Sequence, residues 1–354
     1  MNYFKFLGKK NRIIQMKMFS NLITKVAMFS TKKYDREYFK SNICENKSKL
    51  AITYIEEQLN ENTYIMAQDH SIICVFVNDR LNSEVLIKLS ELNIKKIVLR
   101  CAGFNNINLE KAKELNFRIV RVPAYSPHSV AEHAVCLMLA LNRKLKKSID
   151  RSRDLNFELD GLLGFDMNGK TVGVIGTGRI GLILIKILLG FGCKVICCDP
   201  FKNPEVESLG LPYVDLNTIY KESDIISLHC FLNNETFHTI NEKAINQMKK
   251  GVMIINTSRG ALIDTHAVIL GLKSGQVGYL GIDVIEHEED VFFSDLSDSV
   301  IQNDEIARLL VFNNVIITAH QAFFTKEAIN NIALTTIENI ICLAEDKVCK
   351  NQIN

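Results

Sequence analysis

The stretch that decides the fold is TVGVIGTGRIGLILIKILLGFGCKVICCDP, residues 171–200. It begins with an apolar strand pattern, passes through G-x-G-x-x-G at Gly176, Gly178 and Gly181, and continues as a long apolar helix pattern. A second strand pattern follows and ends at Asp199. A strand, a glycine-rich turn, a helix and an acid after the next strand predict a βαβ unit that binds a dinucleotide.

Each glycine of this motif has its own physical task. Gly176 permits the tight turn, Gly178 lets the backbone approach a pyrophosphate, and Gly181 lets the helix pack close to the strand. Free N–H groups and the helix dipole would hold the phosphates at the start of the helix. We therefore expect cofactor contacts along the loop, including its two inner residues Arg179 and Ile180.

Asp199 favours NAD over NADP. It lies 18 residues after Gly181, at the end of a strand pattern. A carboxylate there accepts both ribose hydroxyls and repels a 2′-phosphate, whereas Lys202 nearby leaves some room for NADP. The alternative is a glycine turn in a doubly wound fold that binds no nucleotide.

Composition and charge exclude several classes of protein. The chain has 354 residues, of which 47% are hydrophobic and 23% charged, as expected for a soluble protein of about two domains. No run of 18 uncharged apolar residues occurs, so we expect no membrane span. The first 34 residues carry a charge of +8 and the whole chain +2, which leaves −6 for residues 35–354. An acidic body argues against nucleic-acid binding.

The cysteines and histidines do not form metal-binding patterns. The ten cysteines include no C-x-x-C, and most lie in apolar runs such as VICC and HAVCLML. This usage predicts reduced, buried thiols in a reducing compartment. The eight histidines form no H-E-x-x-H and no spacing with cysteine that binds zinc, so we expect no metal site.

Strand and helix patterns alternate from Val26 onward, which predicts parallel sheets covered by helices. Pro123 and Pro127 bracket an expected domain crossing, and one long helix is expected over residues 128–149. A closing helix is expected over 325–344. Strand patterns occur at 72–77, 97–99, 118–122, 171–175, 194–198, 225–228, 253–256, 279–284 and 315–318.

Residues 1–24 read as an N-terminal extension that is basic and free of acids. One interpretation is a transit peptide, which would make the location mitochondrial. The other is a disordered leader, or sequence upstream of a later start at Met18 or Met28, with a cytoplasmic location.

Three polar residues follow apolar strand patterns. Arg259 lies in MIINTSRGALID, Glu288 in GIDVIEHEED and His320 in VIITAHQAFF. Ligands bind at the carboxyl ends of the strands in open parallel sheets, so we expect these side chains to face one crevice. Each alone is more often a surface ion pair, a solvated acid or a structural histidine.

Together these three side chains suit the reduction of a 2-oxo acid. His320 can donate a proton to the carbonyl oxygen and accept it in the reverse direction. Glu288 would favour the protonated imidazole and fix its tautomer. Arg259 can bind a substrate carboxylate and stabilise charge that develops on the carbonyl oxygen.

The chain resembles the D-isomer-specific 2-hydroxyacid dehydrogenases from about Lys25 to its C-terminus. The matching stretches are STKKYD, LRCAGFNNINL, VRVPAYSPHSVAEHA, GKTVGVIGTGRIG, SDIISLHC, GVMIINTSRGALID, GIDVIEHEEDVFF and AHQAFFTKEA. Arg259 and His320 are 61 residues apart, and the inserted segment VFFSDLSDSVIQNDEIARLL is similar to that of the fermentative D-lactate dehydrogenases. Phe231 and Ile285 depart from the family pattern.

The resemblance implies two doubly wound parallel-sheet domains of the α/β class. A Rossmann-type cofactor domain, residues 125–319, would be inserted in a flavodoxin-like substrate domain. The latter would comprise residues 25–124 and 320–354, after the extension at 1–24.

The resemblance also implies a role for particular positions. The catalytic triad would be Arg259, Glu288 and His320. The substrate would be bound by Ala102, Gly103, Tyr125 and Phe323. The cofactor would be bound by Gly176, Gly178, Arg179, Ile180, Gly181, Asp199, Cys230, Thr257 and Asp283.

The expected function is NAD-dependent reduction of pyruvate to D-lactate, which is reversible. One alternative is a larger 2-oxo acid, such as a precursor of hydroxyisocaproate or phenyllactate. Another is a corepressor-like protein that senses NAD, since such proteins share the fold. The expected partners are the small-molecule substrate and further copies of the chain, in a homodimer or homotetramer, with neither nucleic acid nor membrane.

Overall fold

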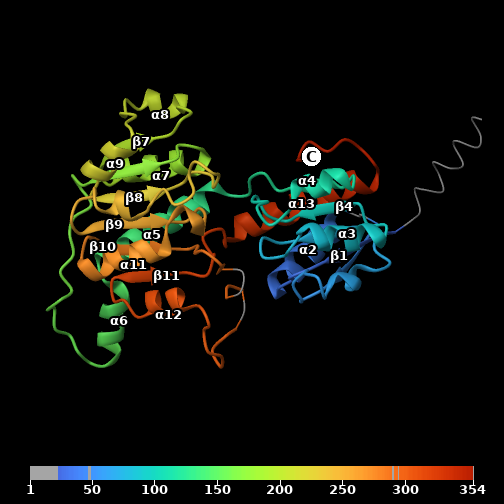
Figure 1. Ribbon diagram of the computed structural model, residues 1–354, viewed down its shortest axis with the longest axis horizontal. Coiled ribbons are helices and arrows are strands. Elements are labelled where there is room, and N and C mark those ends of the chain that lie inside the picture. Colours follow the sequence, from blue (N-terminus) through green and yellow to red (C-terminus); the bar gives the residue numbers. More distant parts are fainter. Residues whose placement is uncertain (1–22, 47–48, 289–290, 294, 354) are drawn as a thin grey trace, which may run out of the picture. The chain divides into compact units, whose positions relative to one another are not determined.

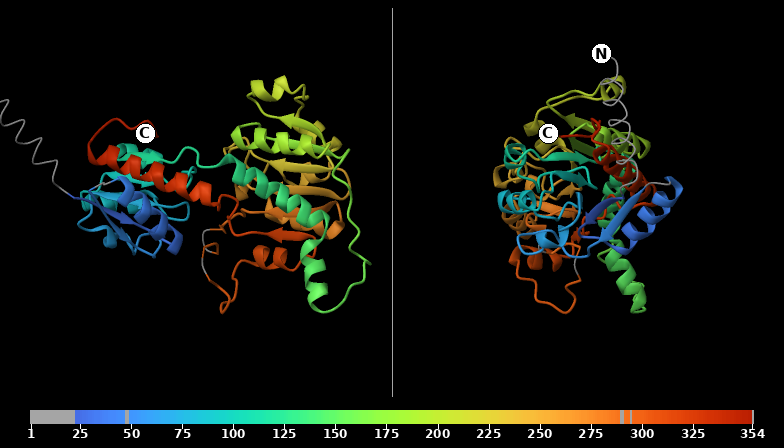
Figure 2. Two further views of the ribbon diagram at one scale, coloured as in Figure 1. Left: turned by 180° about the vertical axis from the view of Figure 1, so that it is seen from behind. Right: turned by 90° about the vertical axis from the view of Figure 1, so that its right-hand side faces the viewer.

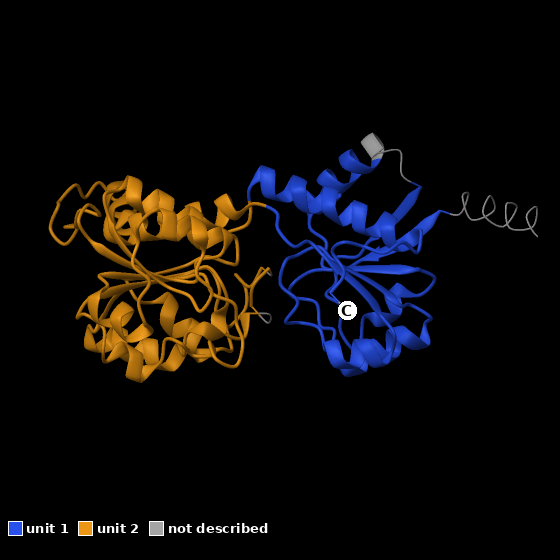
Figure 3. Cartoon of the chain, turned by 90° about the horizontal axis from the view of Figure 1, so that it is seen from above, with its two compact units in different colours: residues 1–125, 325–354 blue, residues 126–324 orange. Residues whose placement is uncertain are grey.

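Helices and strands alternate along the chain in the computed structural model (Figure 1), which describes residues 23–46, 49–288, 291–293 and 295–353. The chain divides into two compact units (Figure 3). Unit 1 comprises the residues up to Tyr125 and those from Thr325 onward, and unit 2 runs from Ser126 to Phe324. No helix among the described residues is long and apolar enough to span a membrane.

Unit 1 contains a parallel sheet of five strands in the order β2-β1-β3-β4-β5. This order is that of flavodoxin-like folds. The strands are β1 (Thr24–Met28), β2 (Leu50–Tyr54), β3 (Ile72–Val75), β4 (Lys96–Leu99) and β5 (Arg118–Arg121).

One face of this sheet is covered by a helix from the far end of the sequence. Thr325 caps α13 (Lys326–Ala344), whose Ala333, Ile337 and Ile340 join a core with Val26 and Met28 of β1. Alternate side chains of each strand point to the same face of the sheet, and the apolar face of one helix packs on several adjacent strands. The other elements of unit 1 are α2 (Lys33–Asn46), η1 (Tyr64–Ala67), α3 (Ser83–Glu91) and α4 (Leu109–Glu114).

Unit 2 contains a parallel sheet of six strands in the order β11-β10-β9-β8-β6-β7. Tyr213 forms an isolated parallel bridge with Cys197 of β7, in the place of a further edge strand. Counting this bridge, the order is 3-2-1-4-5-6-7, which is the 3-2-1-4-5-6 order of a Rossmann fold with β11 added beyond β10. The strands are β6 (Thr171–Ile175), β7 (Lys194–Cys198), β8 (Ile225–Leu228), β9 (Val252–Asn256), β10 (Val277–Ile282) and β11 (Val315–Ile317).

Helices cover both faces of this second sheet. Alternate residues of β9 separate the two cores: Met253 and Ile255 pack with α5 and α7, while Val252 and Ile254 pack with α10, α11 and α12. The predicted class, two doubly wound α/β units, is thus confirmed. The helices of unit 2 are α5 (Pro127–Asn142), α6 (Leu145–Arg153), α7 (Arg179–Gly190), α8 (Pro204–Ser208), α9 (Leu216–Glu222), α10 (Glu242–Ile245), η2 (Gly260–Leu262), α11 (Thr265–Ser274) and α12 (Asp304–Leu310).

The long helix expected over residues 128–149 is wrong, because the structure has two helices there. Helix α5 ends at Asn142, and Lys144 takes the left-handed conformation with φ of 49° before α6 begins. The side chain of Asn142 bonds the backbone of Phe165 through both its oxygen and its nitrogen, which fixes this end of α5. Helix α6 has no buried residue and projects from unit 2 (Figure 2).

The expectation for the cysteines also needs correction. Cys342, near the end of α13, forms a disulfide with Cys349, and Cys136 is exposed rather than buried. The segment after Cys349 lies antiparallel to β5, where Arg121 N–H donates to the carbonyl of Asn351 at 3.1 Å. The disulfide therefore links α13 to the segment that extends the sheet edge.

Two boundaries differ from those expected. Strand β1 begins at Thr24, so the last residue of the expected extension is part of the sheet, paired with Leu50. Residues 1–22 lie outside the described residues, and their targeting role stays a prediction. The chain returns to unit 1 after Phe324 rather than at His320, because the segment from His320 to Ala322 is bonded to Asp283.

Candidate active site

Three strands of unit 2 end side by side. The last residues of β9, β10 and β11 are paired in register, Ile282 lying between Asn256 and Ile317. The segments that follow these residues carry Arg259, Glu288 and His320. All three segments therefore leave the sheet at its carboxyl edge, where open parallel sheets bind ligands.

The structure brings His320 and Glu288 together. Nδ1 of His320 lies 2.6 Å from Oε1 of Glu288, and both side chains are less than one-fifth exposed. The second oxygen of Glu288 accepts a hydrogen bond from the N–H of Ile285 at 2.9 Å, which fixes the carboxylate. With Nδ1 bonded to the carboxylate, Nε2 of His320 is the ring nitrogen that can exchange a proton with a substrate.

Other acids of the run between Glu286 and Asp290 do not compete for this role, as far as the structure describes them. Glu286 accepts from Nε2 of His238 at 2.8 Å, and its other oxygen bonds Thr265. It therefore joins two loops and is not directed to His320. Residues 289 and 290 lie outside the described residues.

Asp283 anchors the loop that carries His320. Its fully buried carboxylate accepts from the N–H groups of Gln321 and Ala322 at 2.8 Å each and from the hydroxyl of Thr318. His320 itself has φ of 51°, a left-handed conformation that is uncommon for residues other than glycine. These bonds hold the segments on both sides of His320, and the predicted contact of Asp283 with the cofactor stays a prediction.

The sequence reasoning missed one residue of this network. His133 of α5 places Nε2 3.0 Å from the hydroxyl of Thr318 and 3.6 Å from the carboxylate of Asp283. Burial lowers the pKa of His133, and the charge of Asp283 acts in the opposite direction. His133 lies in the stretch AEHA, so its position in a matching motif was the only signal.

Arg259 follows β9 in an extended conformation, with φ of −140° and ψ of 139°. Its carbonyl accepts a hydrogen bond from the side chain of Asn256 at 2.8 Å, which fixes the backbone after the strand. The next residue is Gly260, where an added Cβ would lie 2.1 Å from the carbonyl carbon of Ile285. Close approach of these two loops therefore requires glycine beside Arg259.

The glycine loop after β6 has the geometry that a dinucleotide requires. Gly176 has φ of 97°, and a Cβ on Gly181 would lie 2.0 Å from the carbonyl oxygen of Gly176. In contrast, a Cβ on Gly178 would meet no atom within 4 Å. Gly178 precedes α7, which begins at Arg179 and Ile180 and has no side-chain cap. The first turn of this 12-residue helix thus presents N–H groups to an open space.

Two further groups at this edge fit NAD. The hydroxyl of Thr257, after β9, is buried and has no hydrogen-bond partner among the residues that the structure describes, which is rare for a buried polar atom. Asp199, after β7, accepts from the N–H of Thr177 at 2.6 Å and from the N–H of Phe201 at 2.9 Å. Its carboxylate is therefore fixed beside the glycine loop, with acceptor capacity left for a ribose hydroxyl.

His229 and Cys230 form the loop that Gly176 approaches. The carbonyl of Cys230 accepts from the hydroxyl of Ser258 at 2.7 Å, and burial raises the pKa of its thiol to about 11. Burial also lowers the pKa of His229 to about 4. Both groups are therefore neutral near pH 7, which suits a wall of a cofactor site and not a nucleophile–base pair.

The remaining predicted substrate residues are divided between the units. Ala102, Gly103 and Tyr125 belong to unit 1, whereas Phe323 belongs to unit 2 and is 7% exposed. The carbonyl of Tyr125 accepts from the side chain of Asn331 at 2.7 Å. Their predicted contacts with substrate remain proposals.

This fold and this edge define an NAD-dependent oxidoreductase, and comparison with known proteins narrows the class. A family model, "D-isomer specific 2-hydroxyacid dehydrogenase, NAD binding domain", matches residues 135–322. A 2-hydroxyacid dehydrogenase homolog of Haemophilus influenzae is 50% identical over 92% of this chain and 98% of its own length.

Solved structures give the same result. The apo structure of D-lactate dehydrogenase from Escherichia coli superposes with a TM-score of 0.83 and 45% identity, covering 94% of this chain and 100% of that one. D-lactate dehydrogenase from Aquifex aeolicus, complexed with NAD and lactic acid, has a TM-score of 0.80 and 34% identity, covering 91% and 96%.

The chain belongs to the D-isomer-specific 2-hydroxyacid dehydrogenase family, as the sequence predicted. It is an NAD-dependent dehydrogenase.

Proposed function

We propose that this enzyme interconverts pyruvate and D-lactate, with His320 as the acid and base. The observation that carries the proposal is the 2.6 Å contact between His320 and Glu288 at the carboxyl edge of the sheet that also carries the glycine loop. The relatives named as D-lactate dehydrogenases support the choice of substrate.

The residues of the chain divide the chemistry between binding and proton transfer. NADH, when bound, supplies the hydride for the carbonyl carbon. His320 gives the carbonyl oxygen its proton from Nε2, while Glu288 stabilises the imidazolium before transfer and keeps the ring oriented. Arg259 binds the substrate carboxylate and polarises the carbonyl with its planar guanidinium.

The other substrate contacts follow from side-chain and backbone chemistry. In this proposal the N–H groups of Ala102 and Gly103 hold the carboxylate, and Tyr125 and Phe323 enclose the methyl group. The cofactor is held by the glycine loop, with Asp199 on the ribose and Thr257 and Cys230 lining the site.

The product of a single reaction tests this function. Purified protein incubated with pyruvate and NADH should give D-lactate, measured by chiral chromatography. A panel with 2-oxoisocaproate and phenylpyruvate should give the highest kcat/KM for pyruvate. L-lactate as the product would overturn the proposal. A preference for a larger acid would change the substrate and leave the roles of the triad intact.

Replacement of Glu288 by Gln should lower kcat for pyruvate reduction more than it raises KM. The carboxylate lies 2.6 Å from Nδ1 of His320, where its charge stabilises the imidazolium and its hydrogen bond orients the ring. Glutamine keeps the shape but removes the charge, so proton transfer should slow while the groups proposed to bind substrate stay in place.

The measurement is kcat and KM for pyruvate from steady-state NADH consumption. The matched control is Glu305→Gln on α12, whose carboxylate lies 3.9 Å from the exposed His266. If the kcat of Glu288→Gln equals that of the wild type, Glu288 does not assist His320 in proton transfer.

A further inference from the structure

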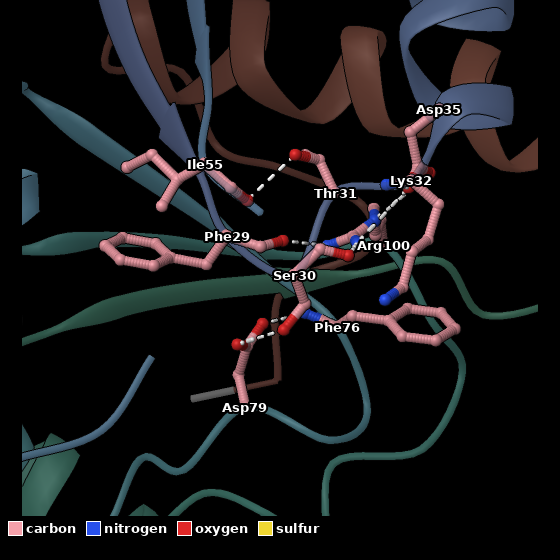
Figure 4. Close-up of polar contacts among 9 residues, drawn as sticks. All are labelled: Phe29, Ser30, Thr31, Lys32, Asp35, Ile55, Phe76, Asp79 and Arg100. Carbon is pink, nitrogen blue, oxygen red and sulfur yellow. Dashed lines mark hydrogen bonds and ion pairs between the residues drawn. The ribbon is translucent and has the colours of Figure 1, made fainter. Parts of the chain in front are cut away.

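Unit 1 contains an arginine that is buried as completely as a core leucine. Arg100 follows β4 and is 1% exposed (Figure 4). Its guanidinium donates to the carbonyls of Phe29 at 2.9 Å and Ser30 at 2.7 Å, and Nε lies 3.3 Å from the carboxylate of Asp35. A buried charge is tolerated only when it is paired and hydrogen bonded, and Arg100 meets both conditions.

A second buried acid completes the cluster. The carboxylate of Asp79 accepts from the hydroxyl of Ser30 at 2.7 Å, from the N–H of Leu59 at 2.7 Å and from the N–H of Phe76 at 2.6 Å. The ring of Phe76 lies under Arg100, 4.7 Å from it. Ser30 is thus bound from two sides, its carbonyl by Arg100 and its hydroxyl by Asp79 (Figure 4).

The electrostatics of the cluster keep the guanidinium charged. Burial opposes the charged form of Arg100, but Asp35 and other nearby groups outweigh burial, and the pKa of Arg100 lies above its ordinary value. Burial raises the pKa of Asp79, an effect that Arg100 and the three hydrogen bonds reduce. The guanidinium of Arg100 therefore stays charged at neutral pH.

These contacts join three loops at the carboxyl edge of one sheet. The loops follow the adjacent strands β1, β3 and β4, and they begin at Phe29, Phe76 and Arg100. A buried ion pair adds little net stability compared with apolar packing, but it fixes the relative orientation of the groups that it joins. The cluster therefore determines where each loop starts more than it determines the stability of the sheet.

The loop after Arg100 contains the two residues expected to bind the substrate carboxylate. The carbonyl of Ala102 accepts from Arg121 at 2.6 Å, and the carbonyl of Gly103 accepts from the thiol of Cys101 at 3.3 Å. Neither the N–H of Ala102 nor that of Gly103 has an acceptor within the part of the chain that the structure describes. Both carbonyls are thus held while both N–H groups stay available.

We propose that Arg100, together with Asp35 and Asp79, is a positioning residue for substrate binding: it fixes the start of the loop whose N–H groups at Ala102 and Gly103 hold the substrate carboxylate. This inference rests on the proposed function. A lysine would keep the charge, but it has no planar fork to reach Phe29, Ser30 and Asp35 together.

Steady-state kinetics of Arg100→Lys test this role. The KM for pyruvate should rise about 10- to 100-fold, since charge-assisted hydrogen bonds that position the loop are lost. The kcat at saturation and the Kd of NADH, measured by its fluorescence, should stay within about twofold. Hydrogen exchange at the amides of residues 101–104 should be faster in the variant, which a purely stabilising residue would not cause selectively.

Two further variants complete the experiment. Arg118→Lys, at the amino end of β5, is the matched control, because its side chain is 28% exposed and pairs with Asp346; its KM should not change. Ser30→Ala removes one hydroxyl and leaves Arg100 paired, so it tests the role even if Arg100→Lys does not fold. Its KM should rise about 2- to 10-fold.

An unchanged KM together with unchanged exchange at residues 101–104 in the folded variants would overturn the inference, as would a loss of kcat alone. If the wild type reduces no 2-oxo acid, the proposed function fails. Exchange at the same amides then decides whether Arg100 positions the loop.

Discussion

His320→Asn should lower kcat for pyruvate reduction by about 10²- to 10⁴-fold, the usual contribution of a general acid. Asparagine is chosen because it tolerates the left-handed backbone of His320, with φ of 51°, better than alanine does. It removes the proton carried on Nε2 but keeps the loop conformation that Asp283 fixes. The loss should therefore report on proton transfer and not on misfolding.

Rapid-mixing or steady-state assays of NADH consumption give kcat, and NADH fluorescence gives the affinity for the cofactor. The Kd of NADH should stay close to that of the wild type, because the glycine loop is untouched. His266→Ala on the exposed surface of α11 is the control and should retain full activity. A variant of His320 with kcat within tenfold of the wild type would remove His320 from the mechanism.

Gly178→Ala should weaken NADH binding by about tenfold or more, which corresponds to at least about 1.4 kcal/mol. The added Cβ meets no atom of the described residues within 4 Å, so the free protein should be as stable as the wild type. In the proposed site that open space is where the pyrophosphate approaches the backbone. The added methyl group would therefore clash only with bound NADH.

Two other glycines provide the comparison. Gly190→Ala near the end of α7 also meets nothing within 4 Å and should change neither stability nor NADH affinity. Gly181→Ala places its Cβ 2.0 Å from the carbonyl oxygen of Gly176 and should lower the melting temperature as well. Equal NADH affinity in Gly178→Ala and the wild type would show that the pyrophosphate does not lie at this loop.

The sequence predicted the fold and the main pair of the site because their signals are local. The glycine loop requires three glycines within six residues, and His320 and Glu288 each follow a strand pattern directly. Parallel strands place such positions at one edge, so their meeting follows from the fold class.

What the sequence could not predict depends on contacts between distant segments. The end of α5 is set by Asn142 bonding Phe165, and Lys144 carries no sequence signal for its left-handed backbone. Asp283 has its bonding partners more than 30 residues away, so only the tertiary structure shows it as an anchor of the His320 loop. The same holds for the disulfide between Cys342 and Cys349, since pairing depends on where the tail lies after α13.

The discontinuous construction of unit 1 has a consequence for biosynthesis. All five parallel strands have emerged from the ribosome once β5 is translated, but the core around Val26 and Met28, to which α2 contributes Phe39, lacks the residues of α13 until the end of synthesis. Unit 2 is contiguous and can fold during that interval. The nascent chain therefore carries an incompletely covered apolar face for about 200 residues of synthesis, and a chain truncated before Lys326 should depend on chaperones to remain in solution.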